Sequence, residues 1–183
     1  FTGQIYNGLL LTGCFAEMDI VNNNSRFYTE DNYIQFVEDM KQRILETNGV
    51  FGTLEHPENY ATHAKEISHK VVDIWYDKQL KKVFGTILVL NTPNGLIVKE
   101  IYESGSWLSI SARGGGKEID QPNGTKKSVL QIMVTFDIVT HPGFSNAAMD
   151  KIIDKDKLSD GEFTVLNENV IPNQDFYSII TYA

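Results

Sequence analysis

A histidine followed by proline, His56-Pro57, closes a short apolar stretch that begins at Gly52. Proline disfavours helix at the residue before it, so the chain is expected to turn outward at His56. An imidazole titrates near neutral pH, and a histidine held at a strand end is therefore suited to accept and return a proton as a general base. An ordinary surface histidine in a turn would show the same local pattern.

Ser111 is a candidate nucleophile, because it ends an alternating stretch and precedes a run of glycines at residues 114–116. Glycine permits a tight turn and the close approach of a substrate backbone. Nearby N–H groups would be available to a developing oxyanion. A polar strand face followed by a flexible loop would look the same. The spacing of a phosphate-binding loop, G-x-x-x-x-G-K-[ST], is absent, so we discount that use of the glycines.

Asp137 interrupts an apolar run over residues 129–139. A period of two places it either on the solvent face of a strand or in a polar pocket. A buried carboxylate needs hydrogen-bond donors, and an imidazole N–H is one of them. Asp137 is therefore a candidate for the residue that orients the histidine of a catalytic triad.

Metal binding is the competing use of the histidines. The separations of His56, His63 and His69 match neither the H-E-x-x-H helix pattern nor the short spacing of zinc ribbons. A metal-dependent hydrolase would be sensitive to chelators. We expect no metal and no cofactor.

One helix is expected between Thr29, which can cap its start, and Gly49, which can stop it. The acidic residues Glu30 and Asp31 suit the positive end of the helix dipole. Apolar residues recur at helical spacing through the segment, at Tyr33, Val37, Met40 and Ile44.

Most other segments read as strands. We expect strands at residues 8–13, 71–76, 83–90, 107–111 and 127–139, and a second short helix around residues 98–102. The glycine-rich stretch 113–116 and the turn-like stretch 121–124 are expected to connect the last two strands. Strands without regular βαβ alternation predict an α+β fold with a mainly antiparallel sheet or barrel. We expect one domain over residues 1–149 and a C-terminal appendage over residues 150–183.

Composition narrows the functional classes. The 183 residues include 24 Asp and Glu against 16 Lys and Arg, a net charge of −8, and a single cysteine, Cys14. One cysteine excludes a disulfide framework and a cysteine-rich zinc module. The acidic balance argues against a nucleic-acid partner. No run reaches the roughly 20 apolar residues needed to cross a bilayer, so we expect a soluble protein without a membrane partner.

Several short motifs, in this order along the chain, resemble the prohead core proteases of large tailed bacteriophages. The match covers residues 8–148, and its motifs are GLLL from Gly8, NSRFY from Asn24, GxLxHP from Gly52, SHK from Ser68, GTIL from Gly85, TPxG from Thr92, SISARG from Ser109 and FDIVxxP from Phe136. Each motif alone is weak, but together and in register they are specific.

The resemblance implies a serine endopeptidase of capsid maturation, related in fold to the herpesvirus assemblin proteases. That fold is a mainly antiparallel β-barrel with surrounding helices. The resemblance also implies His56 as general base and Ser111 as nucleophile. Its implied substrates are scaffold and major capsid proteins, and the chain itself, cut inside the assembling prohead in the host cytoplasm. We expect a homo-oligomer.

The third member of the triad has two candidates. Asp137 is preferred, because a carboxylate orients an imidazole more strongly than a second imidazole does. His141 is the alternative, since the related herpesvirus enzymes carry a histidine on the corresponding strand. For the oxyanion we expect donors either from Arg113 and Gly114 or from the loop of Ser145 and Asn146.

Two further expectations follow from the resemblance. Such proteases cut after a glutamate that follows a branched apolar residue by two, and Leu166-Asn167-Glu168 in the appendage fits this pattern for self-cleavage. The rival function is a non-catalytic capsid or scaffold component that keeps the protease fold. The presence of both His56 and Ser111 in their motifs argues against that rival.

Overall fold

The structure is a computed structural model of the chain, and it describes residues 8–151. Its elements are, in order, β1 (Leu9–Glu17), β2 (Arg26–Tyr28), α1 (Glu30–Thr47), β3 (Val50–Thr53), the 3₁₀ helix η1 (Ala64–Glu66), β4 (Ile67–Asp77), β5 (Lys82–Val89), α2 (Pro93–Glu103), β6 (Ser109–Asp120), β7 (Lys126–Val139) and β8 (Met149–Lys151). β8 spans the expected domain boundary after residue 149. The rest of the expected appendage, with Glu168, lies outside the described residues.

Both expected helices are present. α1 begins after Thr29 and ends at Thr47, and the left-handed φ of 57° at the following Asn48 lets the Gly49 N–H donate back to the Ile44 carbonyl. Its inward stripe is the expected set of buried residues, Tyr33, Val37, Met40 and Ile44. α2 is longer than expected, and the Thr92 hydroxyl caps it by accepting from the Gly95 N–H. Within residues 8–151, neither helix is both long and apolar enough to cross a membrane.

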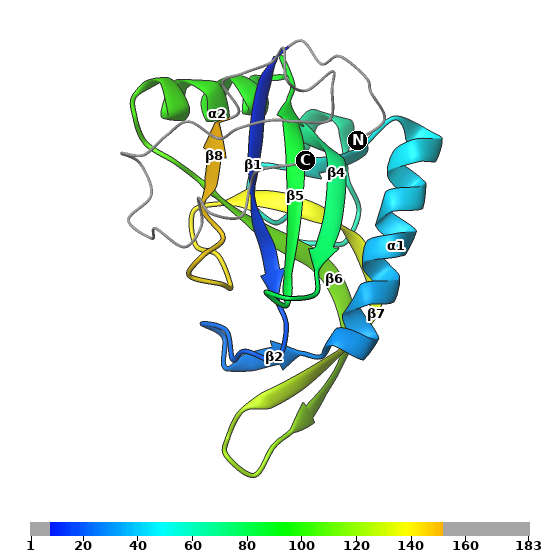
Figure 1. Cartoon of the computed structure of the whole chain (residues 1–183). Coiled ribbons are helices and arrows are strands. Elements are labelled where there is room, and N and C mark those ends of the chain that lie inside the picture. Colours follow the sequence, from blue (N-terminus) through cyan, green and yellow to red (C-terminus); the bar gives the residue numbers. More distant parts are fainter. Residues whose placement is uncertain (1–7, 152–183) are drawn as a thin grey trace.

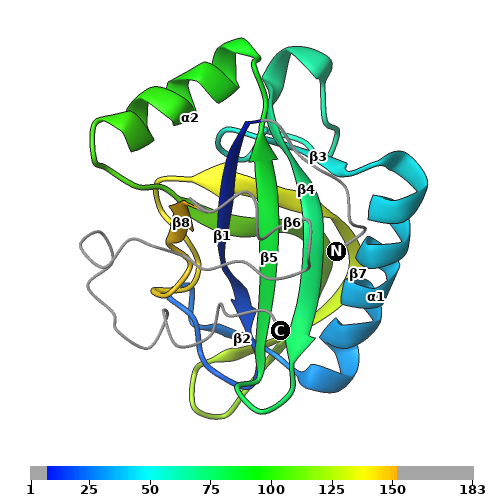
Figure 2. The same cartoon turned by 45° about the horizontal axis from the view of Figure 1, so that its top comes forward.

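The strands form two sheets that pack face to face. The larger sheet has the order β3-β4-β5-β1-β8 and its pairs are antiparallel; the smaller has the order β2-β7-β6. In Figures 1 and 2, β6 and β7 pass behind β1, β5 and β4, and α1 lies along one side. Aromatic rings join the two layers, since the ring centroids of Phe15 on β1 and Phe136 on β7 are 4.7 Å apart.

The mainly antiparallel α+β fold is confirmed, but the expected barrel is not closed. The two end strands of the larger sheet, β3 and β8, have only four and three residues. Neither of these two strands forms a ladder with the second sheet. The two sheets instead meet at isolated bridges, Leu54 with Ile138 on one side and Ser109 with Ala148 on the other.

The expectation that the glycine-rich stretch 113–116 forms a connecting loop is wrong, because this stretch lies inside β6. The β6–β7 register shifts twice there, between Arg113 and Gly114 and between Gly115 and Gly116. These bulges bring the backbones close, and a Cβ on Gly116 would lie 2.1 Å from the Val129 carbonyl oxygen. Glycine here permits close strand packing and does not break the strand.

Candidate active site

Ser111 and Asp137 lie directly opposite each other on the paired strands β6 and β7. Their chain neighbours Ile110, Phe136 and Ile138 are buried in the apolar core. Because side chains alternate along a strand, Ser111 and Asp137 share the other face. The chain that follows β3 covers this face, so Asp137 is fully buried without pointing into the apolar core.

A strained residue two positions after β3, Glu55, aims His56 at this face. Glu55 has a φ of 63°, in the left-handed region that costs a non-glycine residue about 1 kcal/mol. Its N–H donates to the Ile138 carbonyl at 2.7 Å, and its Oε1 accepts from both the N–H and the hydroxyl of Thr140 at 2.9 Å. These bonds fasten the turn to β7 and bring His56 over Asp137.

His56 connects the other two candidates. Its Nδ1 lies 2.7 Å from Asp137 Oδ2, and its Nε2 lies 3.0 Å from Ser111 Oγ. An ionised carboxylate only accepts, so Nδ1 carries the proton and Nε2 is free to accept the proton of the Ser111 hydroxyl. The arrangement suits removal of a serine proton by a general base.

Asp137 is held as an anion. Burial alone would raise the pKa of Asp137, but hydrogen bonds from His56 and Thr53 and the positive charge of Arg113 outweigh burial and lower it. The Thr53 N–H lies 2.9 Å from Asp137 Oδ1, with the Thr53 hydroxyl at 3.0 Å. Arg113 adds Nη2 at 3.1 Å from Oδ1 and Nε at 2.9 Å from Oδ2. Nε is close enough to Oδ2 for an ion pair, but its N–H is not aligned for a hydrogen bond.

The contacts of Thr53 and of the Arg113 side chain with Asp137 were not predicted from the sequence. Thr53 carries no local signal, since its role depends on where β3 meets β7. The Arg113 side chain had a signal, because residues two apart on a strand share a face and Arg113 follows Ser111 by two. The guanidinium is turned inward toward Asp137, so it is not placed among the exposed donors of an oxyanion site.

His141, the alternative third member, lies in the exposed turn after β7. Its Nδ1 is 2.9 Å from Thr140 Oγ1. The side chain behind the His56 ring is therefore that of Asp137.

The second expected oxyanion loop runs beside the start of β6. The Ser145 hydroxyl donates to Asn23 Oδ1 at 3.2 Å, and the Asn146 amide donates to Glu17 Oε1 at 3.1 Å. These side chains hold the loop in place. A contribution of this loop to an oxyanion site would have to come from main-chain N–H groups.

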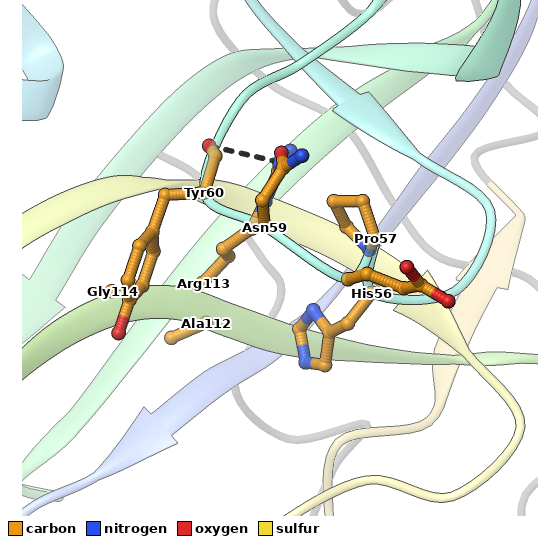
Figure 3. A pocket seen from close by; sticks show the side chains of 8 residues that line it. His56, Pro57, Asn59, Tyr60, Ala112, Arg113 and Gly114 are labelled. Carbon is orange, nitrogen blue, oxygen red and sulfur yellow. Dashed lines mark hydrogen bonds between the residues drawn. The ribbon is translucent and has the colours of Figure 1, made fainter.

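A cavity of about 320 Å³ opens beside His56. Figure 3 shows its wall, formed by the loop after β3 and by β6, with Pro57, Asn59, Tyr60, Ala112, Arg113 and Gly114 labelled. A second hollow of about 250 Å³ continues along β6 and shares Tyr60 and Gly114 with the first. The Tyr60 ring lies over Gly115, where a Cβ would come within 2.9 Å of the Tyr60 hydroxyl.

The remaining histidines are structural or exposed. His69 is fully buried on β4, with Nδ1 2.8 Å from the Ser68 hydroxyl and Nε2 3.0 Å from the Phe136 carbonyl. A Cβ on Gly52 would lie 2.4 Å from His69 Nε2, so only glycine lets β3 pass over this bond. His63 is exposed before η1. Among residues 8–151, no group of three His, Cys, Asp or Glu side chains is arranged to hold a metal ion.

His69 makes stability depend on pH. Burial lowers the pKa of His69 to about 4, so the folded chain resists protonation where the unfolded histidine, at about 6.5, accepts it. This stabilising contribution is present above pH 6.5 and is lost as the pH falls toward 4. We expect it to remove about 2 kcal/mol from the free energy of unfolding between pH 7 and pH 5.

Urea unfolding at the two pH values measures this loss. His69→Gln should flatten the pH dependence relative to wild type, whereas His63→Gln, at an exposed site, should leave it unchanged. An equal pH dependence in wild type and His69→Gln would contradict the assignment.

Comparisons with known proteins agree with this architecture. A family model described as prohead core protein serine protease matches residues 2–156. Among solved structures, the bacteriophage T4 capsid assembly protease gp21 is similar, with a TM-score of 0.67 and 22% sequence identity, over 74% of this chain and 84% of that one. At this identity the likeness concerns the fold. No curated protein matches the sequence significantly.

Proposed function

Since this chain belongs to the prohead core protein serine protease family, we propose that it cleaves peptide bonds with Ser111 as nucleophile, His56 as general base and Asp137 as the residue that orients His56. Family membership makes the chain a protease of bacteriophage capsid maturation. The observation that carries the residue assignment is the continuous line of contacts from Asp137 Oδ2 through the His56 ring to Ser111 Oγ.

In the proposed reaction, Ser111 Oγ attacks the carbonyl carbon of the scissile peptide bond while His56 Nε2 takes its proton. The ionised Asp137 stabilises the resulting imidazolium. The imidazolium then gives the proton to the departing amine nitrogen, and the C–N bond breaks to leave an ester on Ser111. A water molecule then attacks this ester while His56 takes its proton, and the resulting imidazolium returns that proton to Ser111 Oγ as the acid product leaves.

The developing oxyanion needs N–H donors near Ser111. We propose that main-chain N–H groups supply them, either at Arg113 and Gly114 or in the loop of Ser145 and Asn146. The first pair follows the nucleophile by two and three residues on β6, and because peptide groups alternate along a strand the Arg113 N–H faces β7, so Gly114 would be the donor of this pair. The second loop leads into residues that pair with β6 just before Ser111, since the Ile110 N–H donates to the Ala147 carbonyl.

The substrate is expected to lie as an extended strand on the outer edge of β6, the last strand of its sheet. Residues 147–149 occupy this edge before the nucleophile, because the Met149 N–H donates to the Leu108 carbonyl and Ile110 pairs with Ala147. Peptide groups alternate along a strand, so Ala112 faces the same edge, next to Ser111 and in the cavity wall. The two hollows that follow one another along β6 are suited to substrate side chains.

We further propose that the substrates are scaffold and major capsid proteins and this chain itself, with Glu168 as a self-cleavage point. The support is the family's description as a prohead core protein and the similarity in fold to a bacteriophage capsid assembly protease. Cleavage would then take place inside the assembling prohead in the host cytoplasm, by a homo-oligomer. The relation to herpesvirus assemblin proteases and the domain limits 1–149 and 150–183 belong to the same proposal.

Covalent labelling tests the proposed nucleophile. A fluorophosphonate reacts with an activated serine, whose oxygen displaces fluoride from phosphorus. We expect one adduct per chain, mapped to Ser111 by peptide mass spectrometry. His56→Ala should slow labelling by at least about 100-fold, because the serine loses its general base.

Ser109→Ala is the matched control, since Ser109 lies on the same face of β6 but is buried two residues before the nucleophile. It should label at the wild-type rate. A wild-type protein that carries no adduct at Ser111, or labels equally fast without His56, would instead favour a non-catalytic capsid component with the protease fold.

A further inference from the structure

Arg113 is a charged residue buried at the centre of the site. It follows Ser111 by two on β6, and its side chain is only 4% exposed. A buried guanidinium is costly unless its donors are satisfied. Its partners therefore indicate what the residue is for.

One side of the guanidinium engages Asp137. Nη2 lies 3.1 Å from Oδ1, and Nε lies 2.9 Å from Oδ2. Oδ2 is also the oxygen that accepts from His56 Nδ1. The carboxylate is thus held between a planar cation and the imidazole, and Thr53 limits its rotation through its N–H on Oδ1.

The other side of the guanidinium engages the loop that walls the cavity. Nη1 donates to the carbonyl oxygens of Tyr60 at 3.1 Å and Ala61 at 2.9 Å, and Nη2 donates to Thr62 Oγ1 at 2.8 Å. Figure 3 shows the bond from Arg113 to the Tyr60 carbonyl. The loop between β3 and η1 contains no helix or strand of its own, so these bonds tie it to the strand that carries Ser111.

We propose that Arg113 is a positioning residue with two tasks: it holds Asp137 ionised and oriented toward His56, and it holds the 57–62 loop as a wall of the substrate cavity. This inference rests on the proposed function. The Arg113 side chain links the catalytic residues to the wall of the substrate cavity, because its planar guanidinium contacts both Asp137 and the 57–62 loop.

Among the charged and titratable groups described around the His56–Asp137 pair, Arg113 is the buried cation. His69 on β4 contacts the Phe136 carbonyl of β7 and is neutral at neutral pH, since burial lowers its pKa to about 4. Glu55 is adjacent in sequence, but its carboxylate accepts from Thr140. Glu58 lines the exposed cavity. Loss of the Arg113 charge would raise the pKa of Asp137 and let the coupled pair take up a proton at higher pH.

Kinetic variants test both tasks. Arg113→Ala is expected to lower kcat/KM by about 100-fold through misplacement of Asp137, and to move the acidic limb of the kcat/KM profile up by about one pH unit. Added guanidinium ion should restore part of the activity and return the limb toward its wild-type position. Arg113→Lys keeps the charge but not the fork, so it should lose activity with a smaller movement of the limb.

Two other variants separate the tasks. Thr62→Val removes a contact on the loop side alone, and we expect a higher KM with kcat and the acidic limb unchanged. Arg43→Ala is the matched control, because Arg43 also donates to two main-chain carbonyls, in its case those of Met133 and Val134 on β7, without touching the triad. Arg43→Ala should leave the acidic limb of the kcat/KM profile in place. An equal movement of that limb in Arg43→Ala, or none in Arg113→Ala, would overturn the proposal.

A measurement without activity distinguishes this inference from the proposed function. In Ser111→Ala protein, NMR can follow proton uptake by the coupled His56–Asp137 pair, and adding Arg113→Ala should move the midpoint of this uptake to higher pH, because the pKa of Asp137 rises without the guanidinium. An unmoved midpoint would refute the role of Arg113, whereas wild-type proteolysis by Ser111→Ala would refute the proposed nucleophile. Should Arg113→Ala not fold, Arg113→Lys in the same background carries the test, with a smaller movement expected.

Discussion

Replacing Ser111 with alanine is expected to reduce proteolysis by about a million-fold, to the level left by binding and oxyanion stabilisation alone. The Ser111 hydroxyl is the group that His56 Nε2 contacts at 3.0 Å, and alanine removes the oxygen that would form the ester. Cleavage of a phage scaffold polypeptide, followed by gel and intact mass, measures the loss. The same mass spectra report self-cleavage after Glu168.

The fold should survive this change. Ser111 is half-buried on an end strand, and its bond to His56 lies at the surface, so the free energy of unfolding should change by about 1 kcal/mol at most. Ser109→Ala should remain fully active. If Ser111→Ala protein keeps the wild-type free energy of unfolding and still cleaves at the wild-type rate, another residue is the nucleophile.

Asp137→Asn is expected to lower kcat by about 10,000-fold, whereas His141→Ala should leave it unchanged. The carboxylate holds the proton on His56 Nδ1, and an amide N–H in its place would favour the wrong tautomer for a general base. His141 lies in the exposed turn with its Nδ1 beside Thr140, so its removal should not disturb His56.

The asparagine variant also leaves Arg113 as an uncompensated buried cation, which costs about 3–5 kcal/mol. Activity must therefore be compared at a temperature where circular dichroism shows the variant folded. Double replacement with Arg113→Met removes both charges, and we expect it to recover stability but not activity. Full activity of folded Asp137→Asn together with an inactive His141→Ala would reverse the assignment.

Local patterns were enough to predict the helices and the main hairpin. α1 follows from the spacing of Tyr33, Val37, Met40 and Ile44, because helical periodicity depends on residues three and four apart. The hairpin of β4 and β5 follows from two alternating apolar stretches and the polar link between them. Both signals lie within a few residues of the structure that they specify.

The wrong predictions, a loop at the glycines and a closed barrel, concern features that depend on contacts between segments far apart in the chain. Glycines 114–116 have the composition of a loop, yet the packing of β6 against β7 and of Tyr60 over Gly115 keeps them in a strand. The barrel is open because β3 and β8 are followed or preceded only by single bridges to the second sheet, and local propensity does not specify such pairings.

By itself, the sequence determined which side chains were candidates for chemistry: a histidine before a proline, a serine at a strand end and a carboxylate in an apolar run. Only the tertiary structure decided how they meet. The strained turn at Glu55 brings His56 to Asp137, 81 positions away in the chain, and the inward Arg113 holds the carboxylate from behind. The physical reason is that residue type limits which protons a group can exchange, whereas the distances that permit exchange depend on how separate strands pack.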